Sequence, residues 1–308
     1  MKLNRFAKFA WFVVAYHVFV ILWGAFVRAS GSGAGCGSHW PTCNGQVIPR
    51  PEQIETLIEF FHRVTSGLAG VFVIVLLVWA FRRYPKASFG RWMAVLSLIF
   101  VIVEGGIGAA LVRFELVAGD TSAIRGLVVA LHLVNTLVLL TFLTLAAWHA
   151  SGREHAVRVK RPGTAWMLGI GLAGLVIVST AGAVTALGDT LFPAESLQAG
   201  VLQDLDPTAH FLIRLRVIHP MIAVAVSVYL LAIAGVLLET KANVRVSSSI
   251  RALRIVIALQ LVGGLVNVIL LAPVWMQIIH LLLADLLWII LIELAAELLT
   301  EEQVVETG

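Results

Sequence analysis

Long apolar runs, separated by short polar connections, dominate this sequence. Each run is close to the roughly 20 apolar residues that a helix needs to cross a bilayer. Eight such runs account for the apolar sequence, and they cover residues 9–27, 56–81, 92–112, 124–148, 164–187, 211–238, 250–271 and 274–294. The pattern therefore predicts eight transmembrane helices.

Composition supports the same fold class. Hydrophobic residues make up 59% of the 308 residues and charged residues 13%, and the mean hydropathy is +0.95. A soluble domain carries roughly 25% charged residues, so most of this chain must face something other than water. We expect an all-α integral membrane protein. The first run begins with basic residues, as a signal peptide does. It exceeds the roughly 7–15-residue core of one, so we expect it to be retained.

Lys and Arg gather in alternate connections. Fifteen of the 22 lie on one side, three before the first run and four in each of the connections 82–91, 152–162 and 241–254. Connections rich in Lys and Arg stay in the cytoplasm, which predicts a multi-pass protein of the cell membrane with both termini cytoplasmic. The net charge of +4 follows from this asymmetry and implies no nucleic-acid partner.

The second half of the chain repeats features of the first. The pairs are Gly24 and Gly182, Gly105–Gly106 and Gly263–Gly264, His62 and His219, and His132 and His280, at offsets of 158, 158, 157 and 148 residues. Because each half has four helices, an even number, both halves begin on the same side of the membrane. This predicts two pseudo-symmetric four-helix bundles, 1–150 and 151–308, as a parallel repeat. The paired glycines should let neighbouring helices approach closely.

Four histidines lie within the predicted helices at similar depth, about 6–10 residues from the outer ends: His62, His132, His219 and His280. That depth is roughly 9–15 Å at 1.5 Å per residue, in the outer leaflet. Ionisable residues inside a membrane are costly and indicate function. One histidine from each of two helices per half is the arrangement that holds a haem between two axial imidazoles. A single histidine in an apolar helix is more often structural, and His17, which has no counterpart, is interpreted that way. A zinc or copper site would require additional Cys, His or carboxylate ligands nearby, and few are present in the spans.

The two halves differ beside the histidines. Glu59 precedes His62 by three residues and shares its helix face, whereas Arg216 takes the equivalent place before His219. A carboxylate beside a haem can move protons or stabilise positive charge, and an arginine suits a propionate. The other interpretation of Glu59 is a first-turn acid stabilised by the helix dipole. Further candidates for propionate contacts, or for interfacial snorkelling, are Arg28, Arg63 and Arg125.

The only two cysteines, Cys36 and Cys43, lie in the first external connection, 30–55. Outside the cytoplasm, a close pair is most simply a disulfide. Two free thiols binding a metal are the alternative, with His39 as a further ligand.

Together these residues resemble the haem A synthase family, membrane enzymes that convert haem O to haem A. The resemblance covers nearly the whole chain. It rests on Gly31-Ser32-Gly33-Ala34-Gly35-Cys36, Trp40-Pro41-Thr42-Cys43, Glu59-Phe60-Phe61-His62-Arg63, His132, His219 and His280. Many members carry a second cysteine pair in the connection 188–210, which has none here. This indicates a subgroup with a single external pair.

The resemblance implies that His62 and His132 flank the substrate haem, with Glu59 as the catalytic carboxylate. It likewise implies that His219 and His280 ligate a haem B cofactor, and that the cysteines form the family's external disulfide. The reaction would oxidise a ring methyl to a formyl group by successive hydroxylations. Two axial histidines leave no open position on iron. Either one of the two histidines dissociates from the iron during turnover, or electrons are removed from the methyl group and water supplies the oxygen.

Two other classes of function compete with this interpretation. A membrane cytochrome b would use the same histidines for electron transfer without modifying a haem, and would not need Glu59. A transporter predicts broken helices and paired charges at the midplane, where the spans offer little besides Glu104 and Asp285. Candidate partners are membrane lipid, an electron donor, a haem O synthase and further copies of the chain.

Overall fold

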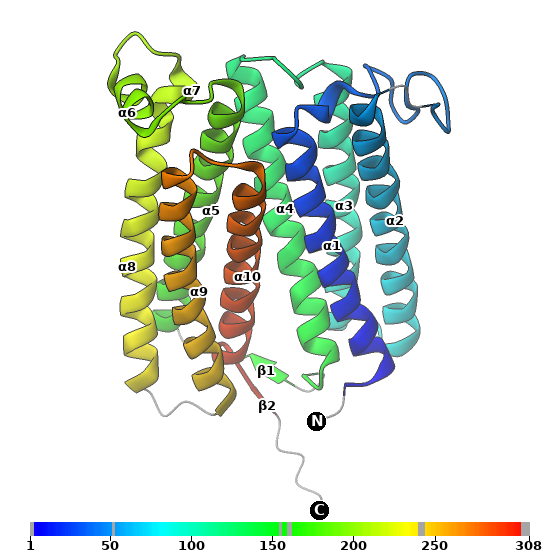
Figure 1. The fold of residues 1–308 in the computed structure, drawn as a ribbon. Helices are drawn as coiled ribbons and strands as arrows, with labels where there is room; N and C mark the ends of the chain where they lie inside the picture. The colour runs from blue at the N-terminus through cyan, green and yellow to red at the C-terminus, as the bar shows by residue number, and fades with distance from the viewer. Residues whose placement is uncertain (1–2, 51–52, 154–155, 159–161, 240–243, 303–308) are drawn as a thin grey trace, which may run out of the picture.

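The computed structural model describes residues 3–50, 53–153, 156–158, 162–239 and 244–302 (Figure 1). Four basic residues counted toward the cytoplasmic side, Lys2, Lys160, Arg161 and Lys241, lie outside the described residues. The long helices are α1 Arg5–Ala29, α2 Ile54–Arg83, α3 Phe89–Arg113, α4 Ala123–Ala150, α5 Pro162–Leu191, α8 Ile218–Glu239, α9 Val244–Ile269 and α10 Val274–Leu298. Within the described residues, eight segments are long and apolar enough to cross a membrane, which confirms the predicted number.

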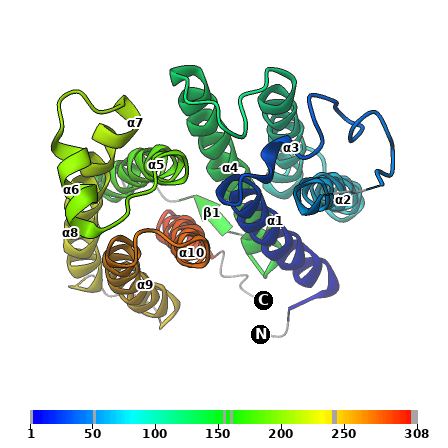
Figure 2. The ribbon, with the colours of Figure 1, turned by 45° about the horizontal axis from the view of Figure 1, so that its top comes forward.

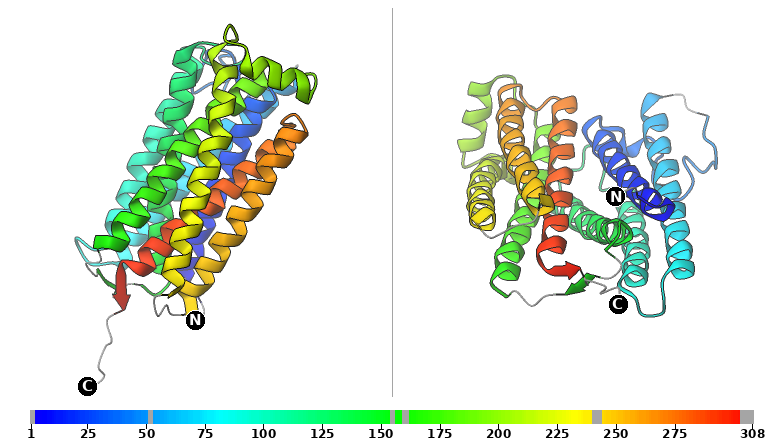
Figure 3. Two further views of the ribbon diagram at one scale, coloured as in Figure 1. Left: turned by 90° about the vertical axis from the view of Figure 1, so that its left-hand side faces the viewer. Right: turned by 90° about the horizontal axis from the view of Figure 1, so that it is seen from below.

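The long helices run side by side, with their connections at two opposite ends (Figures 1 and 3). Several begin with a side-chain cap, because the first N–H groups of a helix have no partner within it. The Asn4 side chain accepts from the Ala7 N–H at the start of α1. Ser88 and Ser122 do the same for α3 and α4.

The sixth span is interrupted rather than continuous. Helix α7 (Phe211–Arg214) passes through a 3₁₀ turn, η2 (Leu215–Val217), before α8 begins. Pro220 explains the break, because its ring has no N–H to donate and clashes with the carbonyl four residues earlier, that of Arg216. A short helix, α6 (Leu197–Leu205), fills the connection before α7 and was not predicted.

Two three-residue strands were also not predicted. Strand β1 (Ala156–Arg158) follows α4, and β2 (Thr300–Glu302) follows α10. They pair antiparallel, with Val157 opposite Glu301. The pair lies at the end where α1 begins, opposite α6 and α7 (Figure 1).

The helices form two groups that contact each other through α1, α4, α5 and α10. Helices α1 to α4 lie on one side and α5, α8, α9 and α10 on the other (Figure 2). Across the junction, the buried Trp288 indole of α10 donates to the Leu137 carbonyl and the Thr141 hydroxyl of α4, at 2.9 and 3.0 Å. The internal symmetry of the predicted halves, 1–150 and 151–308, stays a prediction.

Apolar side chains cover the outside of the bundle as well as its core. Buried residues such as Phe6, Leu143 and Leu294 form the core, while Ile102 and Leu265 are 64% and 62% exposed. Exposed apolar surface on this scale would be a liability in water. On a helix bundle it is the surface that contacts lipid.

The paired glycines behave differently in the two groups. A Cβ added at Gly264 would lie 3.2 Å from the His280 ring, and one at Gly263 would contact other side chains of α10. A Cβ at Gly105 or Gly106 would meet no atom within 4 Å. The predicted close helix approach is therefore wrong for the pair in α3, because no described neighbour fills that face.

Candidate functional site

His219 of α8 and His280 of α10 face each other. Their ring centroids lie 6.4 Å apart, and the ring planes are nearly perpendicular, at 87°. When two imidazoles bind one metal from opposite sides, their ring centroids lie roughly 6 Å apart. This distance is the sum of two metal–nitrogen bonds of about 2 Å and the two centroid-to-nitrogen distances. The separation therefore fits one metal atom between the two rings.

The nitrogens of this pair are only partly used by the protein. Nδ1 of His219 lies 3.2 Å from the Val178 carbonyl of α5. Nδ1 of His280 is buried without a hydrogen-bond partner, and its Nε2 lies 3.3 Å from Nε2 of Gln260 on α9. Buried polar atoms without partners are rare, which is consistent with a missing ligand at this site.

Glycines on neighbouring helices make room for the histidine rings in both groups. A Cβ added at Gly24 of α1 would come within 2.9 Å of Cε1 of His62, and one at Gly182 of α5 within 2.9 Å of Cε1 of His219. Both distances are shorter than a carbon–carbon contact allows. Each ring thus occupies its place because the facing helix has no side chain there.

The first group adds a carboxylate to its histidines. Nδ1 of His132 on α4 lies 3.3 Å from Oε1 of Glu104 on α3. Glu104 also accepts hydrogen bonds from Nδ2 of Asn135, at 2.5 Å, and from the Thr136 hydroxyl. Nδ1 of His62 on α2 is buried without a hydrogen-bond partner. The sequence had indicated Glu104 only as an isolated charge within a span.

Glu59 lies on α2, one turn before His62, and is 3% exposed. Its Oε2 accepts from the Cys36 backbone N–H at 2.8 Å, and its Oε1 accepts from Nη2 and Nε of Arg63 at 2.5 and 3.1 Å. Because α2 begins at Ile54, Glu59 lies beyond the first turn, where Glu55 is found instead. The first-turn interpretation of Glu59 is therefore wrong.

Cys36 and Cys43 form a disulfide, which excludes the alternative of two free thiols. The disulfide loop, residues 36–43, is held against α2. Arg63 donates from Nη1 to the carbonyls of His39 and Thr42, at 2.6 and 2.7 Å. Arg63 therefore contacts both Glu59 and the loop.

The other arginines also bind protein groups. Arg28 of α1 donates to the Ala186 carbonyl, the Thr190 hydroxyl and Oε1 of Gln277, at 2.7, 2.9 and 2.8 Å. Arg125 donates to the Ala118 and Asp120 carbonyls. These contacts are to fixed partners, whereas a snorkelling side chain extends toward water.

Arg216 lies between two aspartates. Its Nε is 3.0 Å from Asp189 and its Nη1 is 3.7 Å from Asp204, and Nη2 donates to the Gly188 and Phe192 carbonyls. Burial raises the pKa of the Asp204 carboxyl, and the Arg216 charge opposes that rise. Propionate contacts by Arg28, Arg63, Arg125 and Arg216 stay a prediction.

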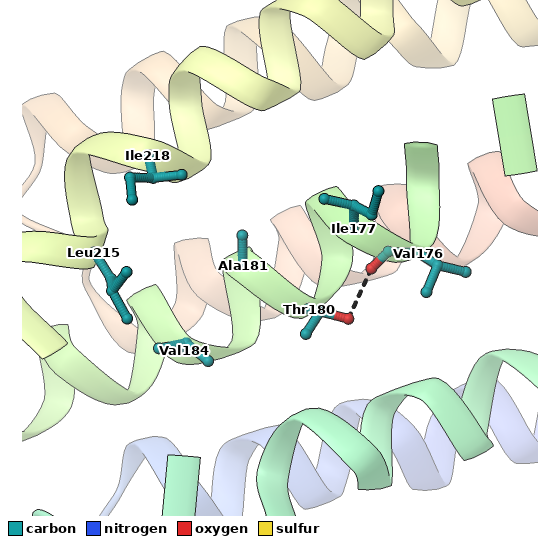
Figure 4. Close-up of a pocket in the computed structure, with 7 residues that line it drawn as sticks. All are labelled: Val176, Ile177, Thr180, Ala181, Val184, Leu215 and Ile218. Carbon is teal, nitrogen blue, oxygen red and sulfur yellow. Dashed lines mark hydrogen bonds between the residues drawn. The ribbon is translucent and has the colours of Figure 1, made fainter. Parts of the chain in front are cut away.

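Two apolar cavities are lined by residues that adjoin His219 and His132 in the sequence, but not by the histidines themselves. The first, about 320 Å³, is lined by residues of α5, η2 and α8, including Ile218 next to His219 (Figure 4). Its one side-chain polar group, the Thr180 hydroxyl, donates to the Val176 carbonyl of its own helix. The second, about 450 Å³, lies between α3 and α4 and is lined by Leu131, the residue before His132. Cavities of this size and character suit apolar ligand groups.

Comparison with known proteins gives relatives of two kinds. A protein of Thermus thermophilus named protoheme IX farnesyltransferase is 46% identical over 297 residues, covering 96% of this chain and 49% of its own length. This chain therefore spans about half the length of that relative. Proteins named heme A synthase include one of Halalkalibacterium halodurans, 39% identical over 155 residues and half of each chain. Another, of an Exiguobacterium species, is 33% identical over 189 residues, 61% of this chain and 60% of its own.

Residues 7–292 match the COX15-CtaA family, described as cytochrome oxidase assembly protein. The match runs from the first turns of α1 almost to the end of α10, and so includes the four histidines, Glu59 and the disulfide loop. The chain belongs to the COX15-CtaA family of cytochrome oxidase assembly proteins.

Proposed function

We propose that the protein is a haem A synthase, an oxidoreductase that converts a ring methyl of haem O to a formyl group by successive hydroxylations. Family membership and the relatives named heme A synthase support this. One observation carries the proposal. Histidines recur in both groups of helices, but Glu59 lies beside them only in the first, where Cys36 and Arg63 hold it.

His219 and His280 are proposed to hold a resident haem B. Their neighbouring rings and the space left by Gly182 and Gly264 fit such a group. When bound, haem B supplies one-electron transfer. The protein's part is to fix both imidazoles and to surround them with the apolar side chains of α5 and α8.

His62 and His132 are proposed to bind the substrate haem, and Glu59 to act on it. Three hydrogen bonds from Cys36 and Arg63 fix the Glu59 carboxylate. A carboxylate held in this way can stabilise positive charge near the reacting carbon or accept its proton. In the second group Arg216 cannot do this, since it is a cation bound to Asp189.

The setting of the reaction is also a proposal. The charge pattern supports a cell-membrane location with both termini in the cytoplasm, and the haem sites toward the outer leaflet. The Thermus relative is about twice as long and is named for farnesyl transfer to protoheme. That name supports a haem O synthase as a partner, and an electron donor is required as well.

A bis-histidine cytochrome b is the second candidate. The geometry of His219 and His280 favours it equally, because facing imidazoles suit electron transfer. It gives no role to Glu59, a buried carboxylate that would be costly to retain.

The test is to identify the haems extracted from membranes that contain this chain and a source of haem O. We expect mass spectrometry to find a formyl-bearing haem. Glu59→Ala should abolish it while both haem sites remain filled, and Glu55→Ala, a matched acid one turn earlier, should retain it. The contrary result is that fully loaded wild-type protein, supplied with reductant and oxygen, yields only unmodified haem B and haem O. That result would favour the cytochrome b function over the synthase.

A further inference from the structure

A second carboxylate within the membrane, Glu104 of α3, is built into the first group of helices. His132, Asn135 and Thr136 are spaced i, i+3 and i+4, so they share one face of α4. Nδ2 of Asn135 donates to Glu104 and also to the Phe100 carbonyl of α3, at 3.0 Å. Because an unpaired carboxylate here would be expensive, three polar groups converging on Glu104 indicate a constructed contact.

Only one of the four candidate ligands has such a neighbour within the described chain. His219 faces a backbone carbonyl. Among the described residues, Nδ1 of His132 makes no formed hydrogen bond, as is also true of Nδ1 of His62 and His280. What sets His132 apart is Oε1 of Glu104, 3.3 Å from its Nδ1. At the offset of 158 residues that relates the glycine pairs, Glu104 corresponds to Val262. The carboxylate is therefore an addition to the first group.

The separation of Nδ1 of His132 from Glu104, 3.3 Å, is slightly longer than the roughly 2.7–3.2 Å of a formed N–H···O bond. Contacts of this kind are often loose before a ligand binds and tighten afterwards. A carboxylate that accepts from Nδ1–H fixes the tautomer, directs the Nε2 lone pair toward a metal and makes the imidazole more basic. A more basic axial ligand favours the oxidised iron.

We propose that Glu104 is a positioning residue: it holds His132 with Nε2 toward the iron of the substrate haem and lowers the reduction potential of that haem relative to the one bound by His219 and His280. The proposal rests on the proposed function in assigning His132 to a haem.

The test compares reduction potentials in the whole protein, with haem B loaded in both sites and no turnover needed. Spectroelectrochemical titration of a His280→Ala variant identifies the signal of the first site. In Glu104→Gln, the preference of that site for oxidised iron should weaken at least tenfold. Its reduction potential should therefore rise by about 59 mV or more, for a one-electron couple. The second site should not move and serves as the internal reference.

Two further variants separate positioning from structural support. Thr136→Val removes a competing donor, so the carboxylate accepts more strongly from His132, and the potential of the first site should fall, opposite in sign to Glu104→Gln. This variant also tests the proposal if Glu104→Gln does not fold. Asp285→Asn alters a buried carboxylate of α10, whose Oδ2 has no hydrogen-bond partner, and should leave the first site unchanged.

The outcomes distinguish this proposal from the proposed function. If the wild type makes haem A but neither the Glu104 nor the Thr136 variant moves the first potential, Glu104 is only structural and the proposal is overturned. If the shifts occur with the expected signs while the wild type never makes haem A, the positioning role stands and the synthase activity does not.

Discussion

At the scale of single residues, Arg63 connects the two parts of the Glu59 environment. One edge of its guanidinium donates to the Glu59 carboxylate, and Nη1 donates to two carbonyls of the disulfide loop. Its five donors in a planar fork suit this double contact, which a lysine ammonium cannot reproduce. Glu59 therefore depends on the loop both directly and through Arg63.

Replacing this arginine should uncouple Glu59 from the loop. In Arg63→Lys, the charge remains but the fork is lost, and we expect haem A formation to fall at least tenfold, or about 1.4 kcal/mol in the barrier, with both haems still bound. Haem A per bound haem is the measurement. Arg82→Lys, at the other end of α2, is the control. Unchanged activity in Arg63→Lys would show that the charge alone suffices.

The glycines that face the histidines give a second prediction at this scale. Gly24→Ala should displace the His62 ring and empty the first site, and Gly182→Ala should do the same to His219 and the second site, because each Cβ would lie 2.9 Å from Cε1. Haem content, resolved by site through optical spectra, is the measurement. Gly70→Ala in α2, where a Cβ would meet no atom within 4 Å, should retain both haems. Equal loss from both sites in either glycine variant would argue for general misfolding instead.

At the scale of elements, the connection between α1 and α2 acts as a fixed part of the site. Its disulfide closes a small ring, and the Thr56 hydroxyl of α2 donates to the Gly35 carbonyl at 2.7 Å. The loop therefore contacts the N-terminal end of α2 at several points and places the Cys36 N–H against Glu59. Elsewhere, α8 begins late because Pro220 cannot extend the helix back through η2.

Removing the disulfide should affect stability and catalysis together. For the Cys36→Ser, Cys43→Ser double variant we expect a loss of about 2–4 kcal/mol, seen as a lower thermal unfolding temperature, and reduced haem A formation. Haem binding by His219 and His280 should persist, since the second group of helices lies apart from the loop. Wild-type activity in this variant would show that the loop needs no cross-link to hold Glu59.

At the scale of the whole molecule, the two groups of helices are joined by polar contacts across their interface. Arg28 of α1 reaches both α5 and α10, and Trp288 of α10 reaches α4. The Arg28 contacts lie at the C-terminal end of α1 and the Trp288 contacts near the middle of α10, so the groups are joined at two levels of the bundle. The distance between the two proposed haem sites is thereby held constant, as the proposed electron transfer between them would require.

Orientation in the membrane belongs to this scale and can be tested directly. Both native cysteines are in the disulfide, so an introduced thiol is easily distinguished. Lys86→Cys lies in the connection between α2 and α3, and Glu195→Cys in the one between α5 and α6. We expect an impermeant maleimide to label Glu195→Cys in intact cells and Lys86→Cys only after the membrane is opened. The reverse pattern would invert the assigned orientation.

The sequence by itself determined the eight spans, because a bilayer demands about 20 consecutive apolar residues and no tertiary contact is needed to read that length. It also singled out the histidines and Glu59, since polar groups inside apolar runs are conspicuous, and the cysteine pair, since these are the only two cysteines in the sequence. The tertiary structure alone decided their partners. The hydrogen bond that the Cys36 N–H donates to Glu59, 23 residues away, depends on how separate elements pack, and so does the contact of Glu104 with His132. The space beside Gly105 and Gly106 depends on the same packing, which hydropathy along one chain does not encode.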